Sequence, residues 1–253
     1  LEACRDNHYN LVLAPVGASR QRKVDDLKVV FEHFAPDGVV LIPPLTDDPV
    51  VLEFLEANHV AFACIAPKHP DGRIGVMMDE TAAVRELMAG LVAQGHRRIG
   101  HIKGPPAHGA CQWRFKGYRE ALRRAGIEYD EDLVVQGAFS FESGIEAGNR
   151  LLDLKRPPTA IFAANDDMAA GVIRAACERG LVVPRDISVC GFDDTPIARH
   201  IYPALTTVRQ PTSDMGRLAA IELLKAIRDR KDGGMVTVPY ALQLRRSTGP
   251  APR

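Results

Sequence analysis

Apolar residues in this sequence follow two spacings, short continuous runs and stripes with helical periodicity. Between residues 159 and 194, an apolar run at 160–164 breaks at Asn165 and two aspartates, residue types that favour turns and helix N-termini. Helical spacing then runs from 168 to 176, and a second apolar run at 187–191 leads to another pair of aspartates. The pattern predicts a strand, a crossover helix and a parallel strand. Polar residues follow both strands, and open α/β sheets bind ligands at the carboxyl ends of their strands.

The same alternation continues along most of the chain. We expect further strands at residues 11–14, 39–42, 61–65, 74–77, 99–102 and 133–136. We expect further helices at residues 24–34, 49–57, 81–94, 113–125 and 143–154. Strands that alternate with helices indicate parallel sheets with helices on both faces, an α/β fold. Glycines and prolines between Gly104 and Gly109 interrupt the alternation, so they predict a boundary between two α/β lobes.

Length and composition fit this interpretation. With 253 residues, the chain can form one large α/β domain or two lobes of ordinary size, and 46% hydrophobic and 25% charged residues are globular values. The 32 basic and 32 acidic residues cancel, which argues against nucleic-acid binding by this chain alone. The five scattered cysteines favour a reducing cytoplasm. The sequence shows no apolar run long enough for a membrane span and no signal peptide, although trimming of the N-terminus could have removed a leader.

Asp193 and Arg114 have the clearest binding chemistry. A carboxylate at the end of a buried strand can accept hydrogen bonds from two adjacent hydroxyls, as a sugar or polyol requires, whereas Asp194 beside it could cap a helix. Arg114 begins a predicted helix, where the helix dipole disfavours a cation, so another group should hold it there. Its planar fork of donors suits carboxylates, phosphates and paired hydroxyls. Either Asn165 or Asp166 should cap the helix that follows them.

Motifs for catalysis and for cofactor binding are missing from the sequence. The chain has no G-x-G-x-x-G after a strand, no G-x-x-x-x-G-K-[ST] and no G-x-S-x-G, and no nucleophile and base form a recognisable pair. The eight histidines show no metal-ligand spacing. We therefore expect no enzymatic activity, no cofactor and no metal ion.

Several segments carry a resemblance to a known family. In chain order they are GHRRIGHIKGP at 95–105, WRFKGYREAL at 113–122, AANDDMAAG from 163, VPRDISVCGFDD from 183 and LTTVRQP at 205–211. Together they resemble the sensor domain of the lac-repressor/galactose-repressor family of bacterial transcription regulators. The resemblance extends from about residue 79 to residue 248.

This resemblance implies two doubly wound parallel-sheet lobes of the periplasmic-binding-protein-like fold, joined by three crossovers, with a ligand cleft between them. It places residues 1–103 and 209–231 in an N-terminal lobe, and residues 104–208 and 232–253 in a C-terminal lobe. A helix at 213–230 would return to the first lobe, and a strand at 236–244 would close the second.

The resemblance also implies a set of ligand-binding residues. The matching positions are Asp79, Arg114, Phe139, Asn165, Asp193 and Gln210. If Asn165 contacts the ligand, Asp166 is left to cap the helix. Asp79 would face the cleft from the first lobe, and Phe139 would stack on the ligand, although a phenylalanine beside a strand is more often a core residue. Gln210 is the weaker candidate. Trp113 departs from the family, which usually has a polar residue before the arginine.

The expected function follows from the same resemblance. We expect an effector-sensing and dimerisation domain of a cytoplasmic transcriptional regulator, which binds a small polar metabolite such as a sugar or sugar derivative. Operator DNA would be bound by an N-terminal helix-turn-helix domain outside this chain, and no membrane would be involved. The alternatives are a periplasmic sugar-binding protein of a transporter, which an upstream signal peptide would favour, and a Rossmann-type enzyme, which turnover or a retained nucleotide would favour.

The start of the sequence suggests that part of the first lobe is missing. The residues LEACRDNH resemble the end of the helix that follows the family's first strand. In a doubly wound sheet of order 2-1-3-4-5 that strand is internal, and its loss would leave neighbouring strands with unpaired backbone groups. We therefore expect a longer native chain with an upstream apolar strand. Strands 11–14 and 39–42 should be separated by a gap, or rearranged to close it.

Overall fold

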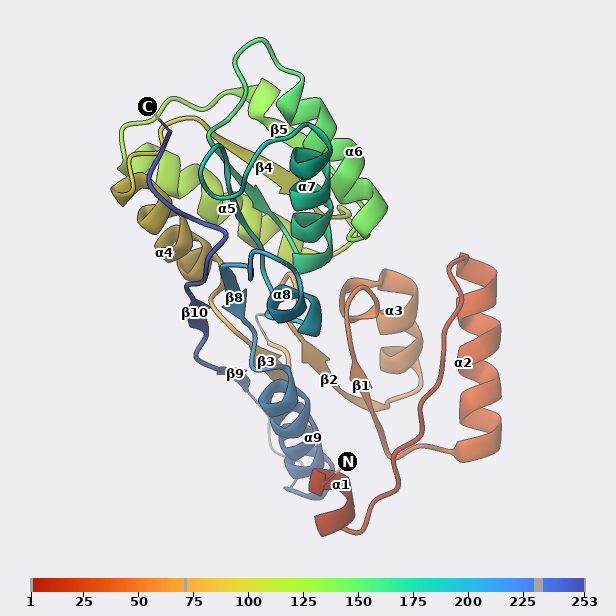
Figure 1. Ribbon diagram of the computed structural model, residues 1–253. Helices are drawn as coiled ribbons and strands as arrows, with labels where there is room; N and C mark the ends of the chain where they lie inside the picture. Colours follow the sequence, from red (N-terminus) through yellow and green to blue (C-terminus); the bar gives the residue numbers. More distant parts are fainter. Residues whose placement is uncertain (1, 71, 230–233, 253) are drawn as a thin grey trace. The chain divides into compact units, whose positions relative to one another are not determined.

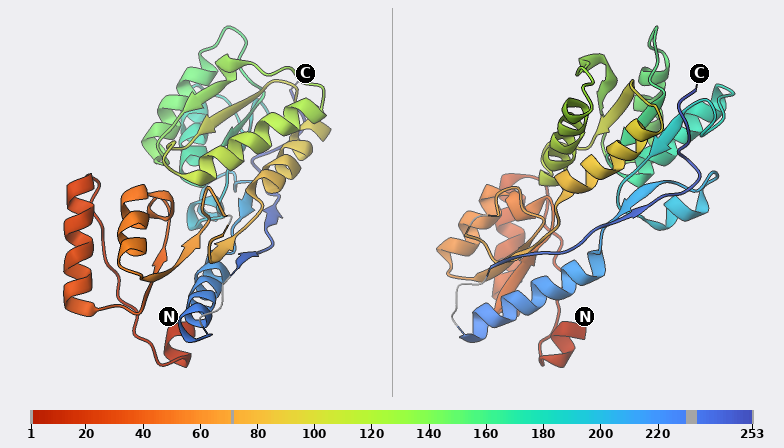
Figure 2. Two further views of the ribbon diagram at one scale, coloured as in Figure 1. Left: turned by 180° about the vertical axis from the view of Figure 1, so that it is seen from behind. Right: turned by 90° about the vertical axis from the view of Figure 1, so that its left-hand side faces the viewer.

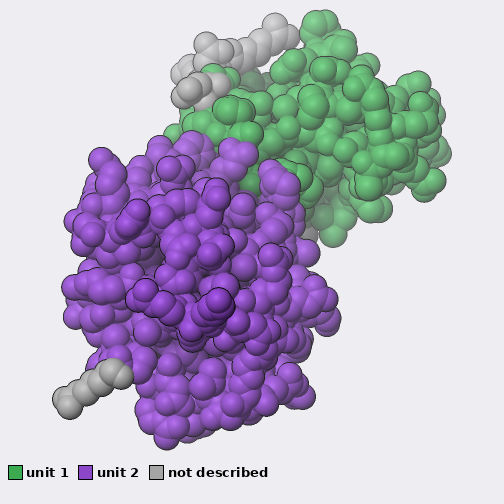
Figure 3. Space-filling view, turned by 90° about the horizontal axis from the view of Figure 1, so that it is seen from above, with its two compact units in different colours: residues 1–78, 107–109, 211–238 green, residues 79–106, 110–210, 239–253 purple. Residues whose placement is uncertain are grey.

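The computed structural model describes residues 2–70, 72–229 and 234–252 (Figure 1). The chain divides into two compact units, coloured separately in Figure 3. Unit 1 contains residues 1–78, 107–109 and 211–238, and unit 2 contains residues 79–106, 110–210 and 239–253. Each unit has its own parallel sheet, so the predicted α/β fold is confirmed.

The sheet of unit 1 has the strand order β1-β2-β3-β9, with all neighbours parallel. Its strands are β1 (Gly38–Leu41), β2 (Ala61–Ile65), β3 (Gly75–Met77) and β9 (Met235–Thr237). The helices of this unit are α1 (Glu2–Asp6), α2 (Arg20–Phe34), α3 (Pro49–Ala57) and α9 (Thr212–Asp229), with a 3-10 turn η1 (Leu45–Asp47). Asp48 caps α3 by accepting the Val50 and Val51 N–H groups, and Pro49 suits the first helical turn.

Helices cover both faces of the unit 1 sheet. Leu27 of α2 and Leu55 of α3 are buried against Leu41 of β1 in one core cluster. Because side chains alternate across a strand, Gly38 points to the other face. A Cβ added there would lie 2.9 Å from Ile227 of α9, so α9 packs tightly over β1 on that face (Figure 2).

The strand expected at residues 11–14 does not form. In the described part of unit 1, β1 pairs only with β2, and residues 11–14 adopt no regular structure. Leu11 and Val12 are exposed, and Leu13 is 87% exposed. A segment becomes a strand only beside a partner whose backbone groups are free to pair with it. The prediction of a strand here was wrong: residues 11–14 pair with no described strand, and β1 has β2 on one side alone.

The main sheet of unit 2 has the order β5-β4-β6-β7 and is also parallel. Its strands are β4 (Ile99–Lys103), β5 (Val134–Gln136), β6 (Ala160–Ala163) and β7 (Ser188–Cys190), while β8 (Thr207–Arg209) and β10 (Ala241–Gln243) form an antiparallel pair. The helices of this unit are α4 (Glu80–Ala93), α5 (Gly109–Arg124), α6 (Phe141–Leu152), α7 (Asp166–Glu178) and α8 (Pro196–His200), with a 3-10 turn η2 (Glu131–Leu133).

Helices also cover both faces of this sheet (Figure 2). Ile102 and Ile161 belong to the core cluster that includes residues of α6 and α7. Their neighbours His101 and Phe162 point to the opposite face. There the ring of Tyr118 from α5 stacks on His101 with centroids 4.9 Å apart. This two-sided burial explains why the strands read as continuous apolar runs in the sequence.

Two elements that were expected in the first lobe lie in unit 2. β4 pairs with both β5 and β6, so it is an internal strand of the second sheet. α4 packs against α5 at Gly117, where an added Cβ would lie 2.8 Å from Val84. The first change of unit therefore comes after residue 78, and the expected boundary after residue 103 was wrong.

The strand expected at residues 236–244 is split into two. β9 pairs with β3 in unit 1, and β10 pairs with β8 in unit 2. Pro239 lies between them and has no backbone N–H with which to continue a ladder.

α6 and α7 approach each other more closely than most helix pairs can. A Cβ added at Gly144 would lie 2.3 Å from the Met168 carbonyl oxygen, and one added at Gly171 would lie 2.3 Å from the Phe141 carbonyl oxygen. Only glycine fits at these two positions. The contact holds the start of α7 in place, and the turn before α7 contains Asn165.

Candidate functional site

Arg114 is a buried cation at the centre of a polar cluster in unit 2. It lies on α5 and is only 3% exposed. Its Nε donates to Glu80 Oε2 at 2.7 Å, one terminal nitrogen donates to the Ala164 carbonyl oxygen, and the other lies 3.3 Å from Asp193 Oδ1. The face of the guanidinium lies 3.7 Å from the ring centre of Phe192. Two carboxylates and a carbonyl therefore hold Arg114 in the first half of a helix, where the helix dipole disfavours a cation.

Asp193 is held by a backbone conformation that few residues adopt. The loop after β7 pairs with β8 through the Gly191 N–H to Thr206 O bond and the Asp193 N–H to Val208 O bond. Asp193 has φ 115° and Asp194 has φ 57°, both in the region that favours glycine. Local strain of this kind is typical of functional sites, where surrounding contacts maintain it.

The Asp193 carboxylate keeps one oxygen for other partners. Its Oδ1 accepts a hydrogen bond from Gln210 Nε2 and faces Arg114. Burial raises the pKa of Asp193, whereas the Arg114 guanidinium and the Gln210 amide lower it. The side chain remains 25% exposed, and neither of these contacts uses Oδ2. Oδ2 is therefore the acceptor that the cluster offers to a ligand.

Asn165 caps α7, and the expectation that Asp166 does so was wrong. The Asn165 Oδ1 accepts the Met168 N–H at 3.0 Å, and its Nδ2 donates to the Phe139 carbonyl oxygen at 3.1 Å. Asp166 is the first residue of the helix, and its side chain turns away to Thr195 and Thr207. The extended backbone of Asn165 is what places its side chain at the cap position.

The expected ligand residues meet only in part. Arg114, Asp193 and Gln210 are in direct contact, and the Phe139 ring centre lies 6.0 Å from the Arg114 guanidinium carbon. Asp79 stays apart from them, because it is exposed and caps α4 by accepting the Ala82 N–H at 2.8 Å. The expected position of Asp79 in the first lobe was wrong as well, since the residue belongs to unit 2.

The family model of the periplasmic binding protein-like domain matches residues 88–248. The chain is 40% identical over 178 residues to the HTH-type transcriptional repressor CytR of Escherichia coli K12, which covers 70% of this chain and 52% of the repressor. It is 39% identical over 210 residues to the HTH-type transcriptional regulator CelR of Thermobifida fusca, which covers 82% of this chain and 60% of the regulator. The chain belongs to the lac-repressor (LacI) family of transcription regulators.

The likeness extends to solved structures of the LacI family. A CelR–cellobiose complex superposes with a TM-score of 0.90 at 33% identity, over 97% of this chain and 76% of that one. The present chain spans about half the length of the E. coli repressor that it matches (52%). Family membership confirms the predicted sensor-domain fold, and the roles of individual residues depend on the geometry described above.

In this LacI-family domain, sequence reasoning missed Glu80 and Phe192. Glu80 directly follows the predicted Asp79 and is 4% exposed, so the buried partner of Arg114 is the neighbour of the expected residue. Phe192 lies inside the recognised GFDD segment but reads as an ordinary core residue. The available signal for Glu80 was its place in the first turn of α4, where an acidic residue is favoured but need not be buried.

Asp194 has a structural role that differs from the expected helix cap. Thr195 occupies the cap position of α8, and Asp194 instead receives Arg245 at 2.5 Å, Arg209 at 2.7 Å and Arg199 at 3.4 Å. Its side chain is 1% exposed. Burial raises the pKa of Asp194, but the arginines outweigh it and hold the pKa below its usual value. The residue therefore ties the loop after β7 to β8 and to the C-terminal segment.

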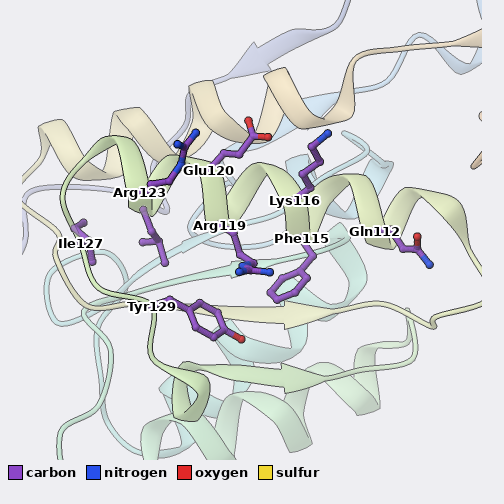
Figure 4. A pocket seen from close by; sticks show the side chains of 9 residues that line it. Gln112, Phe115, Lys116, Arg119, Glu120, Arg123, Ile127 and Tyr129 are labelled. Carbon is purple, nitrogen blue, oxygen red and sulfur yellow. The ribbon is translucent and has the colours of Figure 1, made fainter.

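A separate hollow of about 680 Å³ lies along α5 (Figure 4). Its lining residues are Gln112, Phe115, Lys116, Arg119, Glu120, Leu122, Arg123, Ile127 and Tyr129. The Arg119 guanidinium lies 5.4 Å from the ring centre of Tyr129, and Glu120 pairs with Arg85 at 2.8 Å. None of the predicted ligand residues lines this hollow.

Across residues 2–70, 72–229 and 234–252, no group of three or more His, Cys, Asp or Glu side chains is arranged to hold a metal ion. The helices in the same ranges are all too short or too polar to cross a membrane.

Proposed function

We propose that this LacI-family domain senses a small polar effector through Arg114 and Asp193. The observation that carries the proposal is the buried guanidinium, which fixes one oxygen of Asp193 at 3.3 Å and leaves the other available. Such a preorganised acceptor loses little side-chain entropy when a ligand binds. Paired hydroxyls are the natural partners of a carboxylate oxygen beside a guanidinium, which supports a sugar or sugar derivative.

The remaining predicted residues suit supporting roles in the same site. Gln210 orients Asp193 through Oδ1, and Asn165 holds the Phe139 backbone, so that the Phe139 ring stands near Arg114. An aromatic face near a polar clamp is suited to the apolar face of a sugar ring. A solved relative in complex with cellobiose supports this ligand class.

The effector would act by shifting a conformational equilibrium of the complete regulator. A ligand can shift such an equilibrium only by its differential affinity for the two states. We place operator binding in a helix-turn-helix domain outside this chain, since the curated relatives are HTH-type regulators and this chain has no net charge. The full-length protein would be a cytoplasmic homodimer without enzymatic activity.

Substitution of the two central residues tests the proposal. Arg114→Ala and Asp193→Ala should each weaken binding by about 2–5 kcal/mol, because the first removes the cation that holds Glu80 and Asp193, and the second removes the acceptor proposed for the ligand. The measurement is the rise in melting temperature of each variant with cellobiose and a panel of neutral mono- and disaccharides. Arg174→Ala is the matched control, since Arg174 pairs with Glu178 on the surface of the same unit. Ligand-induced stabilisation that survives in both site variants would refute the assignment.

A further inference from the structure

The charge of Arg114 is more than compensated by the residues around it. Glu80 contacts its Nε and is buried, and Asp193 contacts a terminal nitrogen. The pKa of Asp193 is raised by burial and also by the nearby carboxylates of Glu80 and Asp167. One guanidinium thus contacts two carboxylates, so the positive charge of Arg114 is opposed by more than one acidic group.

Most donors of the guanidinium are already used inside the protein. A guanidinium has five N–H groups. The Nε–H binds Glu80, and the two terminal nitrogens contact the Ala164 carbonyl oxygen and Asp193. The Phe192 ring covers one face of the group. Arg114 is therefore a poor anchor for a ligand carboxylate or phosphate, which would need the bidentate fork to be free.

Other basic side chains of unit 2 near this loop are committed elsewhere. Arg199, Arg209 and Arg245 belong to α8, β8 and the C-terminal segment, and all three contact the buried carboxylate of Asp194. These three arginines contact Asp194, the residue next to Asp193, whereas the cation that contacts Asp193 is Arg114.

We propose that the Arg114–Asp193 site selects neutral, hydroxyl-rich ligands and rejects anionic analogues, and that Glu80 sets this selectivity by neutralising Arg114. The inference rests on the proposed function and specifies its ligand class. Glu80 is a positioning residue, since it acts on a ligand through Arg114. Removal of its charge should leave a guanidinium that can recruit an anion.

The test compares anionic and neutral probes on the wild-type chain, on Glu80→Gln and on Glu120→Gln. The amide oxygen introduced by Glu80→Gln can still accept the Arg114 Nε–H, so the fold should be retained. Glu120→Gln is the matched control, because Glu120 also pairs with an arginine of unit 2 at 2.8 Å but lies outside the site. The probes are glucose 6-phosphate, glucuronate and inorganic phosphate, with glucose and cellobiose as neutral counterparts. Calorimetry and thermal shift are recorded at matched ionic strength.

We expect no anion to bind the wild-type chain or Glu120→Gln in an Arg114-dependent way. Glu80→Gln should bind the anions at least about tenfold more tightly than wild type, as removal of one nearby like charge predicts. This gain should disappear when Arg114→Ala is added. The inference is overturned if wild type binds an anionic probe through Arg114, or if Glu80→Gln gains nothing. Failure of every neutral sugar to bind would instead count against the proposed sugar effector, and the anion comparison would still decide the role of Glu80.

Discussion

Replacement of Asp166 by asparagine should change how the stability of the domain depends on pH. Asp166 is fully buried at the start of α7. Its Oδ2 accepts the Thr195 N–H at 2.8 Å, and its Oδ1 lies 2.6 Å from the Thr207 hydroxyl. Burial raises the pKa of Asp166 to about 7, with a further contribution from the charge of Asp193, although the bonds from Thr207 and Thr195 oppose this shift. The Thr207 hydroxyl can rotate to accept a proton, so the neutral acid fits the same geometry.

The direction and the size of the effect follow from proton linkage. The pKa of an aspartate is about 3.9 in the unfolded chain. Between that value and about 7, the folded state holds a proton that the unfolded state has lost, so the free energy of unfolding falls as pH rises through this window. A shift of this size corresponds to at most about 4 kcal/mol. Asparagine has no charge to bury, and it can accept the Thr195 N–H while it donates to Thr207.

The assay is urea unfolding of wild type and Asp166→Asn at intervals from pH 4 to pH 8. The buried histidines also titrate in this range, since burial lowers the pKa of His96 and lowers that of His101 to about 4. Their contribution cancels in the difference between the two proteins. We expect Asp166→Asn to gain stability relative to wild type steadily from pH 4 to pH 7, by up to about 4 kcal/mol. A difference that stays constant with pH would show that Asp166 is ionised throughout and would refute the reasoning.

Three further predictions concern the frame of the site. Asp194→Ala should cost about 3 kcal/mol of unfolding free energy in urea melts, because Arg245, whose side chain is only 16% exposed, would lose its carboxylate partner. The control Asp214→Ala, on the surface, should cost under about 0.5 kcal/mol. Gly171→Ala should lower the melting temperature, since its Cβ would lie 2.3 Å from the Phe141 carbonyl oxygen, whereas Gly216→Ala, with nothing within 4 Å, should not. Asn165→Ala should cost about 1 kcal/mol through loss of the α7 cap, and equal stability of Asn165→Ala and wild type would contradict the cap assignment.

The parts of the fold that could be predicted from the sequence are those with strong local signals. β2 and α3 begin and end where the apolar pattern placed them, at Ala61–Ile65 and Pro49–Ala57. Residues within or next to such elements mark where they begin, as Asp48 and Pro49 do at the start of α3. The segment at 11–14 has an equally apolar pattern, yet it is not a strand. Pairing depends on a neighbour, and periodicity in one segment says nothing about the segment beside it.

The assignment of α4 and β4 to a unit could not be derived from periodicity for the same reason. The glycines and prolines at 104–109 gave a strong turn signal, but a turn marks an interruption of regular structure and need not separate two cores. The pairing of β4 with β5 and β6 decides the matter, and those strands come much later in the chain, from Val134 onward. Contacts of such sequence separation leave no trace in a local window.

The candidate site shows how partners distant in the sequence decide the role of a residue. Asp166, Asp193 and Asp194 are all aspartates at the carboxyl ends of neighbouring strands, and nothing local distinguishes them. Asp194 is saturated by arginines from three other segments, so it is fixed as a structural anion. Asp166 faces two threonine hydroxyls, which accept either of its protonation states. Asp193 has Arg114 and Gln210 on one oxygen alone.

These differences distinguish the aspartate that can bind a ligand from those that hold the structure together. A carboxylate whose acceptor sites are all filled by the protein gains nothing from a ligand, whereas one with an unfilled acceptor and a fixed orientation gains a full hydrogen bond. Asp193 is of the second kind, because Arg114 of α5 and Gln210, which follows β8, both contact Oδ1 and fix its orientation. Glu80 extends the argument to charge, because an arginine that the protein has already neutralised can orient Asp193 without attracting an anion. The buried partner of the arginine, Glu80, therefore determines which ligands the unused oxygen of Asp193 can select.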